Sequence, residues 1–370
     1  MKKYIDSDVY TEAKKRIRHI VDSFDNIIVC FSGGKDSLVV LSLLEEVYKE
    51  YGITEKIKVC FRDEELIPDD VIRFVQQKAE SGKYDFRYYG IPLKSERFIL
   101  GKNYQYVQWD PNRPHIRKLP DYAITLPEGD KRVFDQYTAD TFICKDLKGK
   151  VAMLTGIRAE ESLFRFRSVV NKLNECYVSA TADTRIKLCK PIYDWTEDDV
   201  FLYFYKTGIS YCPIYDVQML NDENLRVATP CIAESSKRFY KVRTRYPIFY
   251  EQVIQLFPDM LLQERYWSQF GKKESADKYP HTFDGARQYC YENIEDVEKR
   301  RQALMCIDKA EINRENSIAQ GNVPFGGYPL RHVFNQVLNG AYKRGVFQPI
   351  KAKKADYEFE GLKIEDYETK

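Results

Sequence analysis

The chain has 370 residues, of which 44% are hydrophobic and 31% charged, a composition typical of a globular protein with one large domain or two ordinary ones. No apolar run approaches the ~20 residues of a membrane-spanning helix. The Met-Lys-Lys-Tyr start leads into an amphipathic helix and not a secretory signal, so we expect a cytoplasmic protein with no membrane partner. Its 58 basic and 56 acidic side chains leave a net charge of +2, which argues neither for nor against nucleic-acid binding.

Strands and helices are predicted to alternate through the first half of the chain. Apolar runs predict strands at 27–31, 57–61, 86–89 and 151–155. Helical periodicity predicts helices at about 10–24, 37–51 and 71–81. Strands that are apolar on both faces and separated by helices indicate a parallel sheet with helices on each side. The predicted fold class is therefore α/β, doubly wound with a mostly parallel sheet, and ligands are expected at the carboxyl ends of its strands.

The domain organisation follows from where this alternation changes. The stretch at about 90–150 is too long for an ordinary connection, so it is interpreted as an insertion, either a surface excursion or a lid or substrate platform. After residue 235, helical patterns such as 249–262 and 297–310 dominate. The expected division is a nucleotide-binding α/β domain at 1–235, a mainly helical domain at 236–355 and a frayed acidic tail at 356–370.

The hexapeptide Ser32-Gly33-Gly34-Lys35-Asp36-Ser37 lies between the first predicted strand and the helix that follows it. Two glycines let the backbone curl with its N–H groups exposed, and the positive end of the helix points at the same place. Lys35 adds a positive charge and the two serines add hydroxyl donors. Asp36 either caps the helix or helps to hold magnesium. The segment predicts an oligophosphate site, although its spacing is not that of a Walker loop, and a plain glycine-rich turn is the alternative.

Two further strand ends carry candidate ligand residues. Asp63 and Glu64 follow the second strand, where they fit ribose hydroxyls or magnesium, or simply a solvated turn. Gly156 and Arg158 follow the fourth strand, so Arg158 is expected at the sheet edge facing the phosphate site. Arg165 falls on the next helical turns and is a second candidate for phosphate contact.

A third block at 190–200 continues into 211–216. Within it, Thr196 and Asp199 read as a capping box that opens a helix ending near residue 206. A fourth stretch, 237–246, alternates basic and aromatic side chains, which suits either nucleic-acid binding or an amphipathic helix with buried aromatics. A second basic cluster comprises Arg331, His332, Lys343, Arg344, Lys351, Lys353 and Lys354.

These motifs resemble those of a known superfamily. Ser-Gly-Gly-Lys-Asp-Ser resembles the PP-loop of the ATP pyrophosphatases and phosphoadenosine phosphosulfate (PAPS) reductases. The segment from Gly156 to Arg165 resembles the second signature of the PAPS reductases, whose residues meet nucleotide phosphates, and the third block resembles their third conserved block. Over residues 24–216 the chain is identified as PAPS reductase-like, which implies the adenine nucleotide α-hydrolase-like fold.

The resemblance implies roles for these residues. ATP with Mg²⁺ would bind at the hexapeptide, with its β- and γ-phosphates on Gly33, Gly34 and Lys35. Lys35 and Arg158 would stabilise charge on the leaving pyrophosphate, while Asp36 and Asp63 would organise the metal. A nucleophile on an acceptor would attack the α-phosphorus and become adenylylated, and sulfur transfer or nucleic-acid modification could follow.

The cysteines argue against the reductases themselves. No Glu-Cys-Gly-x-His segment is present to supply the thiolate that attacks the sulfonate, so a thiol-dependent PAPS reductase is the weaker alternative. The nine cysteines include no Cys-x-x-Cys pair, and their spacing does not support an iron–sulfur cluster. Buried thiols are the favoured interpretation. The alternative is that Cys212 or Cys231 carries sulfur or, together with Cys144 and Cys189, ligates a cluster.

A third alternative is a non-catalytic nucleotide-sensing subunit of a DNA-binding partner. The segments 63–65, 142–144 and 224–230 look like those of a branch of the superfamily known as a domain of unknown function. Relatives in that branch are often linked with a ParB-like or sulfiredoxin-like protein. Besides the nucleotide, the expected partners are therefore a nucleic acid or such a protein, and homo-oligomerisation stays open.

Overall fold

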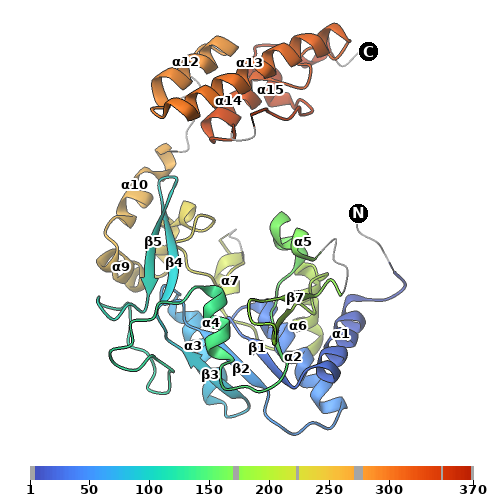
Figure 1. The fold of residues 1–370 in the computed structure, drawn as a ribbon, viewed down its shortest axis with the longest axis vertical. Helices are drawn as coiled ribbons and strands as arrows, with labels where there is room; N and C mark the ends of the chain where they lie inside the picture. Colours follow the sequence, from blue (N-terminus) through green and yellow to red (C-terminus); the bar gives the residue numbers. More distant parts are fainter. Residues whose placement is uncertain (1–4, 170–174, 222–224, 271–277, 343–344, 368–370) are drawn as a thin grey trace. The chain divides into compact units, whose positions relative to one another are not determined.

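The computed structural model describes residues 5–169, 175–221, 225–270, 278–342 and 345–367. The chain forms two compact units, Met1–Trp267 and Ser268–Lys370 (Figure 1). Asn224, Lys343 and Arg344, which belong to stretches singled out above, lie outside the described residues. Among the described residues, no helix combines the length and apolar character needed to cross a membrane.

A six-stranded sheet forms the centre of the first unit, with the strand order β3-β2-β1-β6-β8-β7. The strands are β1 Asn26–Cys30, β2 Lys58–Arg62, β3 Asp85–Tyr89, β6 Val151–Leu154, β7 Val178–Ala180 and β8 Ile186–Cys189. Neighbouring strands are parallel except β7, which runs antiparallel to β8. This confirms the predicted doubly wound α/β fold and the four predicted strands, while β7 and β8 were not predicted.

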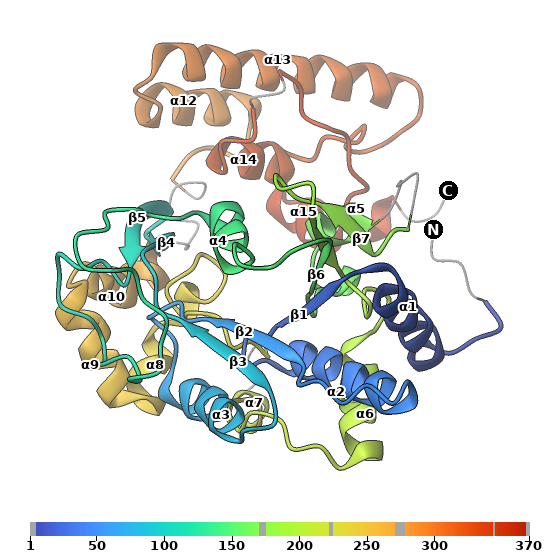
Figure 2. The ribbon, with the colours of Figure 1, turned by 60° about the horizontal axis from the view of Figure 1, so that its bottom comes forward.

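Helices cover both faces of this sheet (Figure 2). Successive β1 residues point to opposite faces, so Val29 lies in one hydrophobic cluster and Ile28 in another. The Val29 cluster takes in side chains from α1 Val9–Ser23, α2 Lys35–Glu50, α3 Asp69–Glu80 and α6 Glu197–Thr207. The Ile28 cluster takes in α4 Gln136–Ile143. Thr196 and Asp199 form the predicted capping box at the start of α6.

The predicted insertion contains an antiparallel hairpin, β4 Leu93–Ile99 with β5 Lys102–Gln108, as well as α4. The hairpin's Ile99 shares a core with Phe239 and Phe249, which come from the helical region after residue 235. That region folds as η2 Ser236–Arg238, α8 Tyr240–Arg245, α9 Pro247–Leu256 and α10 Met260–Phe270. Because these helices pack on the hairpin, they belong to the first unit, and the chain divides between residues 267 and 268, whereas the predicted division lies between 235 and 236.

Two stretches of the helical region, 249–262 and 237–246, can be compared with the prediction. The predicted helix at 249–262 is divided between α9 and α10, because Pro258 lacks the N–H that a continuous helix would use. In the 237–246 stretch Phe239 is buried while Tyr240 is exposed, as in an amphipathic helix. Nucleic-acid contact by this stretch stays a prediction.

The second unit is helical, as predicted, with its own core. Its helices are α12 Phe283–Asn293, α13 Val297–Ala319, α14 Leu330–Leu338 and α15 Lys354–Phe359, followed by η3 Ile364–Asp366. The described part of the segment expected to be a frayed tail, 356–367, includes the end of α15 and η3. Phe359 stacks on His281 with ring centroids 3.7 Å apart, and Glu360 pairs with Arg314 at 2.7 Å.

Candidate functional site

The hexapeptide loop (Ser32–Ser37) connects β1 to α2 at the carboxyl end of the sheet. Gly33 adopts φ +78°, and an added Cβ there would lie 2.8 Å from Val75, so both the conformation and the packing require glycine. Gly34 is the N-cap of α2 and offers no side chain to cap it. Instead, the phenolic oxygen of Tyr215 accepts a hydrogen bond from the backbone N–H of Lys35 at 2.9 Å.

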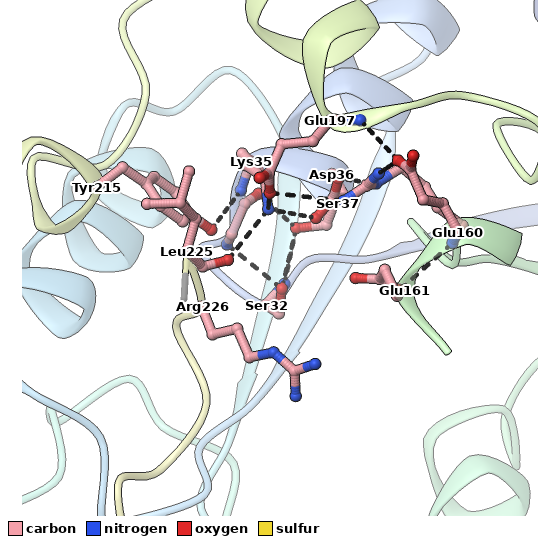
Figure 3. Close-up of polar contacts among 12 residues, drawn as sticks. Ser32, Lys35, Asp36, Ser37, Glu160, Glu161, Glu197, Tyr215, Leu225 and Arg226 are labelled. Atoms are coloured by element: carbon pink, nitrogen blue, oxygen red, sulfur yellow. Dashed lines mark hydrogen bonds and ion pairs between the residues drawn. The ribbon is translucent and has the colours of Figure 1, made fainter. Parts of the chain in front are cut away.

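The two serine hydroxyls shape the loop from within (Figure 3). Ser37 Oγ donates to the carbonyl of Gly34 at 3.0 Å, and Ser32 Oγ accepts from the N–H of Gly34 at 3.3 Å. The two Oγ atoms lie 3.1 Å apart. Both serines also line the adjoining cavity, so their hydroxyls are placed to meet a ligand there.

Gly156 brings the second motif against this loop. An added Cβ at Gly156 would lie 2.5 Å from the carbonyl carbon of Asp36 and 2.6 Å from the backbone nitrogen of Ser37. Only glycine allows the end of β6 to approach the first turn of α2 this closely. The two motifs predicted to share a site therefore do meet.

Lys35 and Arg158 lie behind Asp36 and do not line the cavity. Arg158 is 3% exposed, and its Nε lies 2.7 Å from Oδ1 of Asp36. Lys35 is 2% exposed, with its Nζ 3.3 Å from Oδ2 of Asp36 and 3.1 Å from Oε1 of Glu197 (Figure 3). The expectation that both cations face the phosphates is therefore corrected: acidic side chains hold them behind the carboxylate of Asp36.

A cavity of about 620 Å³ opens where β1, β2 and β6 end. Its cationic lining consists of Arg62, Arg165 and Arg226, and its acidic lining of Asp36, Glu64, Glu96, Glu161 and Glu234. Ser32, Gly34, Ser37 and Gly156 complete the part formed by the two motifs. The start of α2 thus faces an open cavity that is large enough for a small molecule.

The three arginines of the cavity each contact a carboxylate. Arg62 lies 3.0 Å from Asp140. The other two pairs are Arg165 with Glu161 and Arg226 with Glu234. Burial, and next the neighbouring Arg226, lower the pKa of Arg165. Two cations that repel each other beside a helix N-terminus form a place for an anion.

Arg226 was not predicted as a site residue. It belongs to the loop after α7 Ile214–Met219, and the carbonyl oxygen of its neighbour Leu225 accepts from Lys35 Nζ at 3.1 Å. In the sequence, the only indication that the segment 224–230 belongs to the site is its resemblance to one branch of the superfamily. Its position beside the loop comes from the tertiary fold.

Asp63 does not reach the cavity. Its carboxylate is 3% exposed and accepts hydrogen bonds from Tyr88 Oη at 2.5 Å, from the N–H of Glu65 at 2.9 Å and from Arg117. The placement of Asp63 as a nucleotide or magnesium ligand is corrected, because its carboxylate is buried and lies outside the lining of the cavity. Glu64 does line the cavity, and burial raises the pKa of its carboxyl group.

The described residues include no group of three or more His, Cys, Asp and Glu side chains arranged to hold a metal ion. Burial raises the pKa of Cys144, Cys189 and Cys231 to about 12 and that of Cys212 to about 11. These are properties of packed neutral thiols. Mg²⁺ needs only one or two protein carboxylates when it also binds phosphates, and Asp36 fits that requirement.

The fold and the loop define a doubly wound α/β protein with a cavity at the carboxyl ends of its sheet. A family model described as "Phosphoadenosine phosphosulfate reductase domain" matches residues 26–253. The chain belongs to this family, which confirms the family predicted from its motifs.

Individual relatives are more distant. "Uncharacterized protein YbdN" of Escherichia coli (strain K12) is 28% identical over 225 residues, which cover 57% of this chain and 55% of that protein. The chain thus spans about half the length of this relative. FMN adenylyltransferase of Candida glabrata in complex with ATP is 15% identical over 58% of this chain and 62% of its own, with a TM-score of 0.37. A PAPS reductase of Candida auris is 12% identical over 58% of this chain and 93% of its own, with a TM-score of 0.31.

Proposed function

We propose that the chain is a PP-loop ATP pyrophosphatase that transfers the adenylyl group of ATP to an acceptor and releases pyrophosphate. One observation carries the proposal: the loop Ser32–Ser37 and the start of α2 open into a cavity that Arg165 and Arg226 also line. The positive end of a helix and two neighbouring guanidinium groups together suit an oligophosphate.

In this proposal each side chain of the site has a role. The β- and γ-phosphates would rest on the backbone of Gly34 and the hydroxyls of Ser32 and Ser37. Arg165 and Arg226 would exchange their glutamate partners for phosphate oxygens. Asp36 would hold Mg²⁺, which supplies charge neutralisation of the phosphates when bound.

Lys35 and Arg158 are positioning residues in this scheme. Their contacts of 3.3 and 2.7 Å fix the two carboxylate oxygens of Asp36. A carboxylate held by two buried cations keeps one orientation at the cavity wall, which catalysis by electrostatic preorganisation requires.

The proposed reaction is a substitution at the α-phosphorus. A nucleophile of the acceptor forms a bond to this phosphorus, and the bond to the oxygen that bridges to the β-phosphorus breaks. The electron pair leaves on pyrophosphate, whose developing charge Arg165 and Arg226 would stabilise. Nucleic acid is the proposed acceptor and sulfur transfer the proposed later step, with a ParB-like or sulfiredoxin-like protein as a proposed partner.

Two alternatives remain. A thiol-dependent PAPS reductase would use the same cavity, but the cysteines of the helical unit, Cys290 and Cys306, are fully buried in its core, where burial disfavours a thiolate. A nucleotide-sensing subunit would bind ATP without releasing pyrophosphate.

One set of assays separates these functions. The purified chain is incubated with ATP and Mg²⁺, alone and with bulk tRNA or duplex DNA, and pyrophosphate is measured. A parallel incubation contains PAPS and reduced thioredoxin, and sulfite is measured. Pyrophosphate release that depends on the added nucleic acid supports the proposal. Sulfite formation overturns it, and saturable ATP binding with no product under any condition indicates the sensing subunit.

A variant pair ties the activity to the site. Lys35→Ala removes a cation that holds Asp36, and we expect it to abolish pyrophosphate release. Arg73→Ala removes an exposed cation of α3 that pairs with Asp70 and does not line the cavity, so it is expected to leave turnover unchanged. Full turnover by Lys35→Ala would exclude the assigned site.

A further inference from the structure

Two cysteines line the floor of the nucleotide cavity, and the proposed reaction uses neither of them. Cys30 is the last residue of β1, two positions before Ser32. Cys60 lies on the adjacent strand β2, two positions before Arg62. Both line the same cavity; Cys30 is half-buried and Cys60 is buried.

The sheet places these thiols side by side. Cys30 and Cys60 are directly paired in the parallel register of β1 and β2, so their side chains leave the same face. Their Sγ atoms lie 3.9 Å apart. Neighbouring strands are about 4.8 Å apart, which falls within the Cα separation of roughly 4.4–6.8 Å that a disulfide spans.

The two thiols are not chemically equivalent. Cys60 donates its S–H toward the sulfur of Cys30. This hydrogen bond, and next its burial, raise the pKa of Cys60 well above the ordinary value, so Cys60 keeps its proton. Cys30 is the more exposed of the two, so a reactant in the cavity reaches its sulfur first.

We propose that Cys30 and Cys60 form a redox-active dithiol, which a small hydroperoxide entering the cavity oxidises to an intramolecular disulfide. The Cys30 thiolate attacks one peroxide oxygen, the O–O bond breaks, and an alcohol or water leaves, with Cys30 now a sulfenic acid. Cys60 then loses its proton and attacks the Cys30 sulfur, and water leaves as the S–S bond forms. Two thiols and one hydroperoxide thus give one disulfide, one alcohol and one water.

The two cysteines lie next to the proposed nucleotide site, so a bound nucleotide should slow their oxidation. This expectation rests on the proposed function. Phe31 alone separates Cys30 from Ser32. A nucleotide bound to the loop would cover the cavity floor and shield Cys30 from the peroxide. We therefore expect a nonhydrolysable ATP analogue with Mg²⁺ to slow disulfide formation severalfold.

The test is peptide mapping of the full-length wild-type chain. The protein is treated with hydrogen peroxide, its remaining thiols are alkylated, and it is digested with trypsin without reductant. Cleavage after Arg18, Lys35, Lys58 and Arg62 puts the two cysteines into separate peptides, 19–35 and 59–62. The expected product is these peptides joined, two hydrogen atoms lighter than their sum, and separated again by dithiothreitol.

Internal references make the result decisive. Cys176 is also half-buried, and it serves as the measure of peroxide dose. Cys30 and Cys60 found alkylated and unlinked at a dose that oxidises Cys176 would overturn the proposal. In the variants, Cys60→Ser should leave a Cys30 sulfenic acid that dimedone traps, while Cys144→Ser, in the same hydrophobic cluster, should still form the crosslink.

The analogue separates this inference from the proposed function. A crosslink whose rate the analogue does not change supports the dithiol and places the nucleotide elsewhere. Analogue binding without any crosslink supports the nucleotide site and excludes the dithiol.

Discussion

The Nε of Arg158 lies 2.7 Å from Oδ1 of Asp36, which joins the second sequence motif to the first through a buried ion pair. Arg158 is 3% and the Asp36 side chain 15% exposed. The pair also explains how a loop with two glycines keeps one shape, because Asp36 is held from behind while its outer edge faces the cavity.

Removal of this pair should destabilise the whole chain. Arg158→Gln leaves a buried carboxylate with one cation fewer, and we expect the free energy of unfolding to fall by about 3–5 kcal/mol. Arg158→Lys keeps the charge but not the planar fork and should lose less. Urea titration measures both. Arg185→Gln, which breaks the more exposed pair with Asp183, should change stability by less than about 1 kcal/mol, and equal losses for Arg185→Gln and Arg158→Gln would contradict the assignment.

Gly156→Ala should damage ligand binding more than stability alone explains. Its methyl group would meet backbone atoms of Asp36 and Ser37 at 2.5 and 2.6 Å, so the start of α2 must shift. We expect about 1–3 kcal/mol of destabilisation and a loss of ATP-analogue binding in calorimetry. Gly82→Ala, at φ +66° with no neighbour within 4 Å, imposes backbone strain without a clash. Both variants should melt earlier, but only Gly156→Ala should lose binding.

Arg226 and Glu234 should have opposite effects on affinity. Arg226→Gln removes a charge-assisted contact worth about 1.5–3 kcal/mol, which corresponds to roughly 10- to 100-fold weaker binding of the ATP analogue. Glu234→Gln removes the carboxylate that competes for Arg226 and should tighten binding by a smaller factor. Calorimetry at two salt concentrations measures both. A Glu234→Gln variant that binds more weakly than wild type would show that Glu234 itself contacts the ligand.

The loop Ser32–Ser37 was predictable because the residues that form it are consecutive in the sequence. A buried strand, two glycines and a helix start follow one another within about a dozen residues, and local chemistry dictates what they form. Strands β7 and β8 were not predictable in the same way. They have three and four residues, and β7 is only half-buried, so neither shows a distinct apolar run.

The errors at the site have a common physical origin. The sequence places Asp63, Lys35 and Arg158 near the sheet edge, but does not say which neighbours compete for their charges. Arg117, in the insertion, forms an ion pair with Asp63. Glu197, in α6, forms an ion pair with Lys35. Arg226 reaches the cavity through a loop whose path only the tertiary fold determines.

The corrected role of Asp63 is testable against that of Asp36. Asp63→Asn should lower the melting temperature, because Arg117 would lose its buried partner. It should leave the Mg²⁺ concentration for half-maximal nucleotide binding unchanged, whereas Asp36→Asn should raise it. If both variants raised the required Mg²⁺ concentration equally, Asp63 would be a magnesium ligand after all, which would contradict its corrected role.

Glu64 should make stability depend on pH in an unusual direction. Burial raises the pKa of its carboxyl group in the folded state, so the folded chain binds a proton that the unfolded chain releases. The free energy of unfolding therefore falls as the pH rises from the ordinary glutamate pKa to the raised one, with a slope of at most about 1.4 kcal/mol per pH unit. Glu64→Gln removes this titration, so its stability relative to wild type should increase across that window and then level off. Urea titrations at several pH values measure the difference.

The control is Glu251→Gln, at an exposed position of α9, whose free energy of unfolding should follow that of wild type at every pH. If the difference in stability between Glu64→Gln and wild type did not change with pH, the Glu64 carboxylate would not be buried.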